Sequence, residues 1–247
     1  MGFIDGKFRK ARLDQSPWLF HFIKGDDDSP SATLSKILNE KKLTSSRDYI
    51  CFSASPLTSI TKFFNIKTSA TRKPLYHPYG IGFSRDILVR DYQARNVIYY
   101  DSSDEKFISS GLKWRADLLS VDGYDFEYLR EWRVHGRAFD FSSFPPEDMI
   151  IIAPNQDELN DLIVKEDMEF TPVIDWINGD IDPDWTDTYT RKWKGIAVDR
   201  IGNEYLDDYA LSASIVGQVI GEDMVDELFK ESPLYLCSNK KKGKIIS

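Results

Sequence analysis

The stretch EYLREWRVHG, residues 127–136, decides the kind of fold that we expect for this chain. A helix-like run ends at Glu131, and a short strand of alternating character begins at the same residue. Successive side chains of a strand point to opposite faces, so Glu131 and Arg133 share one face and Trp132 lies on the other. The carboxylate either neutralises a neighbouring guanidinium at a strand end or faces a cleft in which positive charge develops.

Working outward from this strand, short apolar runs predict further strands on both sides of it. We expect strands at residues 16–23, 49–55, 96–101, 149–154 and 171–177, and a turn, a strand and a helix start within residues 77–88. Helices are expected at residues 32–43, 104–130 with a break at 121–125, 155–166 with Asn155 as N-cap, and 205–230. Because no regular crossover helices separate the strands before residue 155, the pattern predicts an α+β fold with a mixed sheet.

Three segments follow from this pattern. Residues 1–15 are expected to form an N-terminal arm, and residues 16–170 the α+β domain. Residues 171–247 are expected to form a helical C-terminal extension that carries an acidic loop at 180–187 and ends in a basic tail. The glycines of GIGF, residues 80–83, indicate a close approach of backbone within a strand.

The composition excludes several classes of protein. The chain has 247 residues, of which 41% are hydrophobic, and a net charge of −8. Its acidity disfavours a general binder of duplex DNA, because phosphate neutralisation supplies most of the non-specific affinity of such proteins. Two cysteines and the lack of a long apolar run predict a cytoplasmic protein with no disulfide framework and no membrane partner. No metal site is expected, because the cysteines and the three histidines are not paired at ligand spacing.

Three polar positions stand out within the apolar strands. His21 has phenylalanines on both sides, and it either hydrogen-bonds a backbone carbonyl in the core or serves a site. Ser53 and Ser55 share one strand face, where their hydroxyls either line a pocket or cap the loop at Pro56. With Glu131 they form an ordered series of an early histidine, small hydroxyls and a late carboxylate. Cys51, within the same strand as Ser53, is expected to be inert packing.

The order of short motifs along residues 16–155 resembles that of a known group of proteins. The motifs are LFHF (19–22), ILNEKKL (37–43), CFSASP (51–56), YGIGFSRDIL (79–88), NVIYY (96–100) and EWRV (131–134). This order is similar to that of the AbiGi-type abortive-infection proteins and, more distantly, of the DarT-type ADP-ribosyltransferase toxins. The resemblance implies an ADP-ribosyltransferase-like split mixed sheet that clasps NAD as a substrate.

The resemblance also implies roles for particular residues. His21 would hydrogen-bond NAD, and Glu131 would contact the nicotinamide ribose as the catalytic residue. Loss of nicotinamide leaves positive charge on the ribose, which a preorganised carboxylate stabilises. Around the cofactor the resemblance places the hydroxyls of Ser53 and Ser55, the ring of Tyr99 and the guanidinium of Arg85. All of this requires His21 and Glu131 to meet in one groove.

Two functions remain open at this stage. The first is a phage-defence or toxin enzyme that transfers ADP-ribose to RNA, single-stranded DNA or a protein, with a possible cognate antitoxin. The second is a non-catalytic binding or antitoxin module of the same fold. The second gains weight because serines occupy the segment CFSASP, where the DarT-type group has an arginine. Arg85 and Arg90 are the nearest substitutes, although each also has an aspartate, Asp86 or Asp91, at hand for a surface pair.

Overall fold

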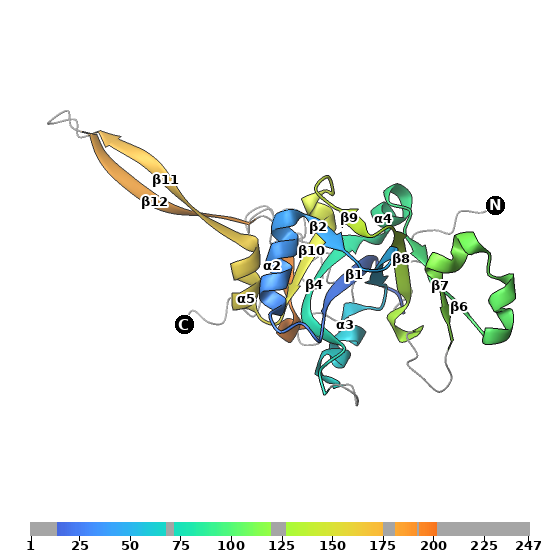
Figure 1. Ribbon diagram of the computed structural model, residues 1–247. Coiled ribbons are helices and arrows are strands. Elements are labelled where there is room, and N and C mark those ends of the chain that lie inside the picture. Colours follow the sequence, from blue (N-terminus) through green and yellow to red (C-terminus); the bar gives the residue numbers. More distant parts are fainter. Residues whose placement is uncertain (1–13, 68–71, 120–126, 175–180, 192, 202–247) are drawn as a thin grey trace, which may run out of the picture.

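The computed structural model describes residues 14–67, 72–119, 127–174, 181–191 and 193–201. Its centre is a mixed seven-stranded sheet in the order β13-β10-β4-β1-β3-β8-β5, in which β10 and β13 are parallel and the other neighbours antiparallel (Figure 1). The predicted α+β class is therefore confirmed. The strands are β1 (Trp18–Lys24), β3 (Tyr49–Ser53), β4 (Tyr76–Ser84), β5 (Arg95–Asn96), β8 (Glu131–His135), β10 (Met149–Ala153) and β13 (Lys194–Ala197).

Alternation along the strands gives the sheet two apolar faces. One face carries Leu19, Phe52 and Phe83 and packs under α2 (Pro30–Glu40), α4 (Arg85–Asp91) and α5 (Gln156–Ile163), and we call it the α2 face. The opposite face carries Phe20 and Ile150 and packs under α3 (Leu57–Ile60) and the 3-10 helix η1 (Thr61–Asn65), and we call it the α3 face. The sheet is therefore the middle layer between two cores.

Two glycines of β4 let the rings of β1 lie against the sheet on the α3 face. A Cβ atom at Gly80 would stand 2.6 Å from the carbonyl oxygen of His21, and one at Gly82 would stand 2.9 Å from the ring of Phe20. Both distances are shorter than real Cβ contacts allow. The predicted close approach of backbone at GIGF is confirmed, and its physical reason is the neighbouring aromatic strand.

Two of the predicted helices are confirmed, with shorter bounds. The helix expected at 32–43 is α2, and Lys41 ends it in the left-handed conformation, with φ of 51°. Lys42–Thr44 then form β2, which pairs with β9 (Ala138–Asp140). At α5 the Oδ1 atom of Asn155 accepts from the backbone N–H of Glu158 at 3.0 Å, which confirms the predicted N-cap.

The helix predicted over residues 104–130 is wrong for most of its described length. Residues 102–118 instead form two 3-10 helices, η2 (Ser102–Phe107) and η3 (Ser110–Arg115), and the strand β7 (Ala116–Leu118), which pairs with β6 (Ile98–Tyr100). A third 3-10 helix, η4, spans Glu127–Leu129. The physical reason is the lack of a buried stripe: η2 has no buried residue, and Phe107 is 73% exposed.

The chain beyond α5 differs most from the sequence prediction. β11 (Val164–Ile174) and β12 (Ile181–Arg191) form a two-stranded hairpin that projects from the body (Figure 1). The acidic loop expected at 180–187 is thus a strand from Ile181 onward, because β12 has β11 as a pairing partner. β13 then joins the main sheet, so the sheet extends past the boundary expected at residue 170. The arm at 1–13, the helices expected at 205–230 and the basic tail lie outside the described residues.

Candidate functional site

His21 and Glu131 lie on opposite faces of the sheet, so the groove that both were expected to share is a wrong prediction. His21 pairs with Ile81 of β4 and contacts the ring of Phe52 at 5.9 Å, both on the α2 face. Glu131 pairs with Ser53, which pairs in turn with Phe20 on the α3 face. Directly opposed residues of an antiparallel ladder share a face, so the register fixes this separation.

His21 has a structural environment. Its Nδ1 atom lies 2.8 Å from the carbonyl oxygen of Cys51, in the interval where β1 and β3 no longer pair. Burial lowers the pKa of His21 from its ordinary value of 6.5, against the opposing effect of this hydrogen bond. The imidazole is therefore neutral at pH 7 and serves as a link between two central strands.

Glu131 is held by a guanidinium on its own strand. The Nε atom of Arg133 donates to Oε1 of Glu131 at 2.8 Å, and the two side chains are 2% and 10% exposed. Arg133 also donates to Asp117 at 2.5 Å and to the carbonyl oxygen of Trp114 at 3.1 Å. Of the two interpretations of the sequence, the neutralised strand-end carboxylate is the one that this geometry matches.

The same ion pairs set the titration of Arg133. Burial by itself lowers the pKa of Arg133, but the hydrogen bonds and charges of Glu131 and Asp117 outweigh it and raise the pKa above its ordinary value. The ring of Tyr49 lies under the guanidinium, 4.0 Å from its central carbon. Arg133 is thus a permanent cation that ties β8 to η3 and β7.

Partly buried groups with hydroxyl or thiol side chains surround Glu131 on the α3 face. Burial, followed by the charge of Glu131, raises the pKa of Cys51 to about 12, which favours the protonated thiol. Burial, with smaller effects of Tyr128 and Glu131, also raises the pKa of Tyr76. Tyr128 stacks on Phe63 with ring centroids 4.4 Å apart. The carboxylate of Glu131 therefore lies in an aromatic and weakly polar environment.

The two serines bond to backbone. Ser53 Oγ donates to the carbonyl oxygen of Leu129 at 2.7 Å, and Ser55 Oγ donates to the carbonyl oxygen of Tyr128. Both residues are buried. Their hydroxyls fasten the end of β3 to the segment that leads into Glu131, and in this arrangement they position the acid rather than line a pocket.

The two remaining candidates lie apart from one another. Tyr99 belongs to β6, in register with Asp117, and is partly buried. Arg85 begins α4, and its Nη1 atom lies 3.4 Å from Oε1 of Gln15. The strand that precedes α4 is separated from β8 by β1 and β3. Arg90, the other proposed substitute, forms a bidentate pair with Asp91 at 2.7 and 2.8 Å.

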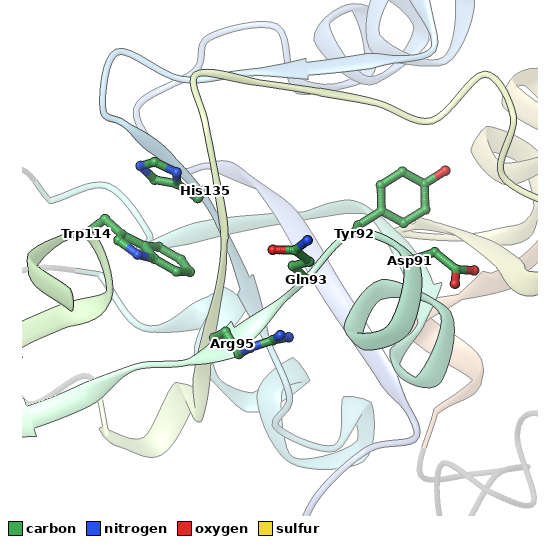
Figure 2. A pocket seen from close by; sticks show the side chains of 6 residues that line it. All are labelled: Asp91, Tyr92, Gln93, Arg95, Trp114 and His135. Carbon is green, nitrogen blue, oxygen red and sulfur yellow. The ribbon is translucent and has the colours of Figure 1, made fainter. Parts of the chain in front are cut away.

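A hollow of about 390 Å³ lies at the far end of β8 from Glu131. Figure 2 shows its walls, with Trp114 and His135 on one side, Gln93 and Arg95 in the middle, and the α4 end on the other. This volume falls within the usual range of small-molecule sites. The lining residues are Asp91, Tyr92, Gln93, Arg95, Trp114 and His135.

The walls of this pocket are fixed by contacts outside it. Tyr92 packs on Phe139 and Phe144, with centroids 5.0 and 5.7 Å away. Trp114 is anchored through its carbonyl oxygen by Arg133, and its ring lies 5.1 Å from that of His135. Trp114 and His135 therefore place two neighbouring aromatic rings on one side of the pocket.

No family model, curated protein or solved structure matches this chain. The geometry of the Glu131 cluster and of the pocket is therefore the basis for a function. Within the described part of the chain, no three His, Cys, Asp or Glu side chains are grouped so that they would hold a metal ion. None of the described helices is both long and apolar enough to cross a membrane.

The pocket residues were not among the sequence candidates. They come from α4, the turn between α4 and β5, β5, η3 and β8, which are spread over residues 91–135, so no local motif unites them. One signal was available: Trp114 stands between Lys113 and Arg115, a combination of aromatic and basic side chains in an acidic chain. That the pocket exists at all depends on the pairing of β5 with β8.

Proposed function

We propose that this chain is a non-catalytic binding module with an ADP-ribosyltransferase-like sheet, which acts in an abortive-infection system. The link to such systems comes from the resemblance of its sequence motifs. The sheet itself supports the proposal in part: the ladder between β1 and β3 consists of the single pair Phe20–Ser53, which suits a split sheet.

One observation carries the proposal. The carboxylate that would stabilise positive charge on the ribose is already paired with Arg133, at 2.8 Å and with 10% of its side chain exposed. A carboxylate with such a partner offers less negative charge to a developing cation. The histidine that would hold NAD beside it lies on the other face of the sheet.

A binding function is supported by the second group of residues. The pocket at the end of β8 has an aromatic wall and a guanidinium, and its lining carboxylate, Asp91, lies on the opposite side from the imidazole of His135 (Figure 2). Asp91, its acid, is occupied by two hydrogen bonds from Arg90. Such a site suits recognition rather than bond cleavage.

A catalytic ADP-ribosyltransferase remains the second candidate because of the surroundings of Glu131. Ser53 lies directly opposite the carboxylate of Glu131 in the β3–β8 ladder. The negative charge of Glu131 contributes to the raised pKa of Cys51 and of Tyr76. In that case Glu131 would work as an ionised carboxylate held in position by Arg133, with RNA, single-stranded DNA or a protein as acceptor.

Release of nicotinamide from NAD separates the two candidates. Purified full-length chain is incubated with NAD alone and with RNA, single-stranded DNA or cell lysate. The binding-module proposal expects no release above that of the Glu131→Gln variant under any condition. Glu127→Gln, an exposed carboxylate on η4 four residues earlier, is the matched control.

The opposite result has a distinct form. If the wild type and Glu127→Gln release nicotinamide while Glu131→Gln does not, and all three unfold at similar temperatures, the chain is an enzyme. The binding-module proposal is then wrong, and Glu131 is the catalytic residue.

A further inference from the structure

We infer that the pocket at the end of β8 recognises a nucleotide unit, with a heterocyclic base on the Trp114–His135 wall and a phosphate at Arg95. The inference rests on the proposed binding function and names its ligand. Such a unit is either a free mononucleotide or one unpaired residue of a single-stranded nucleic acid.

The first argument is the charge of Arg95. Its Nη1 atom donates to the carbonyl oxygens of Ala94 and Val89, at 2.8 and 3.3 Å. No carboxylate of the described ranges forms an ion pair with it. The contrast is its register partner on β8, Arg133, whose charge two carboxylates balance. A partly buried guanidinium that only carbonyl groups hold in place favours an anionic ligand.

The second argument is the aromatic wall. The rings of Trp114 and His135 lie 5.1 Å apart at an angle of 42°, and both residues line the pocket. Trp114 is partly buried and anchored, whereas His135 is exposed. Stacking of a base on such a ring stabilises binding by about 1–3 kcal/mol and tolerates different bases.

The third argument is the conformation of Gln93. Its φ angle is 55°, in the left-handed region that residues other than glycine seldom adopt. It lies between the aromatic wall and the end of α4, with an amide that offers both a donor and an acceptor (Figure 2). A strained residue with these groups at the centre of a pocket suits the hydrogen-bonding edge of a base.

Together these groups match the parts of a nucleotide in chemical type. A planar base would stack on Trp114 and His135, and the amide of Gln93 would hydrogen-bond the polar edge of that base. The guanidinium of Arg95 would bind the phosphate. Lys113, exposed beside Trp114, adds positive charge outside the pocket. Asp91 does not oppose the phosphate strongly, because Arg90 neutralises it.

Calorimetric titration of the full chain with AMP tests the inference, with adenosine and ribose 5-phosphate as fragments and a short oligoadenylate as the single-stranded form. We expect saturable binding of AMP, and weaker binding of each fragment by about tenfold or more. Tighter binding of AMP than of the oligomer identifies a free nucleotide as ligand, and the reverse order identifies a single strand.

Two variants assign the contacts. Arg95→Gln is expected to weaken AMP about tenfold and to leave adenosine unchanged, whereas Trp114→Leu is expected to weaken both. Arg137→Gln makes the same change of charge at an exposed position of the same region and is expected to bind like the wild type. Circular dichroism shows whether each variant is folded, and Arg95→Met, which also removes the charge, serves if Arg95→Gln is not.

Two results would overturn the inference. One is the absence of saturable binding for AMP, GMP, CMP, UMP and the oligomer. The other is equal affinity of the wild type, the folded Arg95 variant and Trp114→Leu for AMP. Neither result affects the proposed non-catalytic role, because that role is tested separately by the release of nicotinamide from NAD.

Discussion

Arg133 is a buried cation, and its ion pair with Glu131 limits the negative charge that this carboxylate offers to a ligand. Only 2% of the side chain of Arg133 is exposed, and two carboxylates and the carbonyl oxygen of Trp114 surround it. A buried ion stays folded only when its partners replace the lost hydration. The pair with Glu131 is therefore a structural requirement of β8, whatever else the acid does.

Removal of this cation should be costly. We expect Arg133→Met to lower the free energy of unfolding by about 3–5 kcal/mol, because it leaves Glu131 buried without its charge partner. Glu131→Gln should cost less, since Arg133 keeps Asp117 and the carbonyl of Trp114. Urea unfolding of the variants measures both changes.

The control for this prediction is the pair of Arg137 and Asp48, whose side chains are 73% and 70% exposed. Arg137→Met should change stability by no more than about 0.5 kcal/mol. If Arg137→Met and Arg133→Met lower the free energy of unfolding by similar amounts, burial of the ion pair does not explain the cost of removing Arg133.

His21 should make stability depend on pH. Because its pKa is lowered in the folded state, the unfolded chain binds more protons just below 6.5, the ordinary value. The free energy of unfolding should therefore fall as the pH is lowered through 6.5 and be constant with respect to this group above that value. His21→Gln should remove this slope, and unfolding in urea between about pH 7 and about pH 5 measures it.

The exposed imidazole of His135 provides the comparison for that experiment. His135→Gln should keep the slope of the wild type, since its side chain is exposed and takes no part in the link between β1 and β3 that His21 forms. If His135→Gln removes the slope and His21→Gln keeps it, the titration has been assigned to the wrong histidine.

At the scale of elements, the β11–β12 hairpin differs from every strand of the main sheet. Its ladder runs from the pair Val164–Arg191 to the pair Ile174–Ile181, and within the described residues neither strand pairs with a third. Isolated two-stranded hairpins are only marginally stable in water. The hairpin is therefore expected to open independently of the body.

Hydrogen exchange checks this expectation directly. Hydrogen-bonded amides of β11 and β12 should exchange about tenfold faster or more than those of the β4–β10 ladder, because local opening exposes them without unfolding the core. Equal protection of the two ladders would contradict the prediction and would indicate that another part of the chain covers the hairpin.

The whole molecule is organised by one sheet between two cores. Leu19 and Phe20 are neighbours on β1, yet Leu19 packs on the α2 face and Phe20 on the α3 face. Both are buried, at 0% and 1% exposure. Since one central strand supplies both cores, we expect them to unfold in a single cooperative transition.

Truncation on each side of β1 tests this cooperativity. Leu19→Ala should lower the free energy of unfolding by about 2–5 kcal/mol, and Phe20→Ala by about 3–5 kcal/mol. Phe107→Ala, at a position that is 73% exposed, should stay within about 0.5 kcal/mol. Tryptophan fluorescence and far-ultraviolet circular dichroism should give coincident transitions, and two separate transitions in either core variant would contradict the prediction.

Local sequence was sufficient for the elements that bury a regular pattern. The run WLFHFI in β1, the apolar MIIIA in β10 and the capped start of α5 all formed where their periodicity and end signals indicate. The errors came where no local pattern decides. The 3-10 helices η2 and η3 have no buried residue, and β12 is a strand only because β11 pairs with it.

The sequence by itself determined the α+β class and the two-sided alternation of each strand, because these follow from which residues along a chain avoid water. Only the tertiary structure decided what Glu131 and His21 face. The pairs Phe20–Ser53 and Ser53–Glu131 set the two residues on opposite sides, and a shift of β1 by one residue would have placed His21 with Glu131. Register between strands distant in sequence is fixed by packing on both faces at once, which no single stretch of the chain encodes.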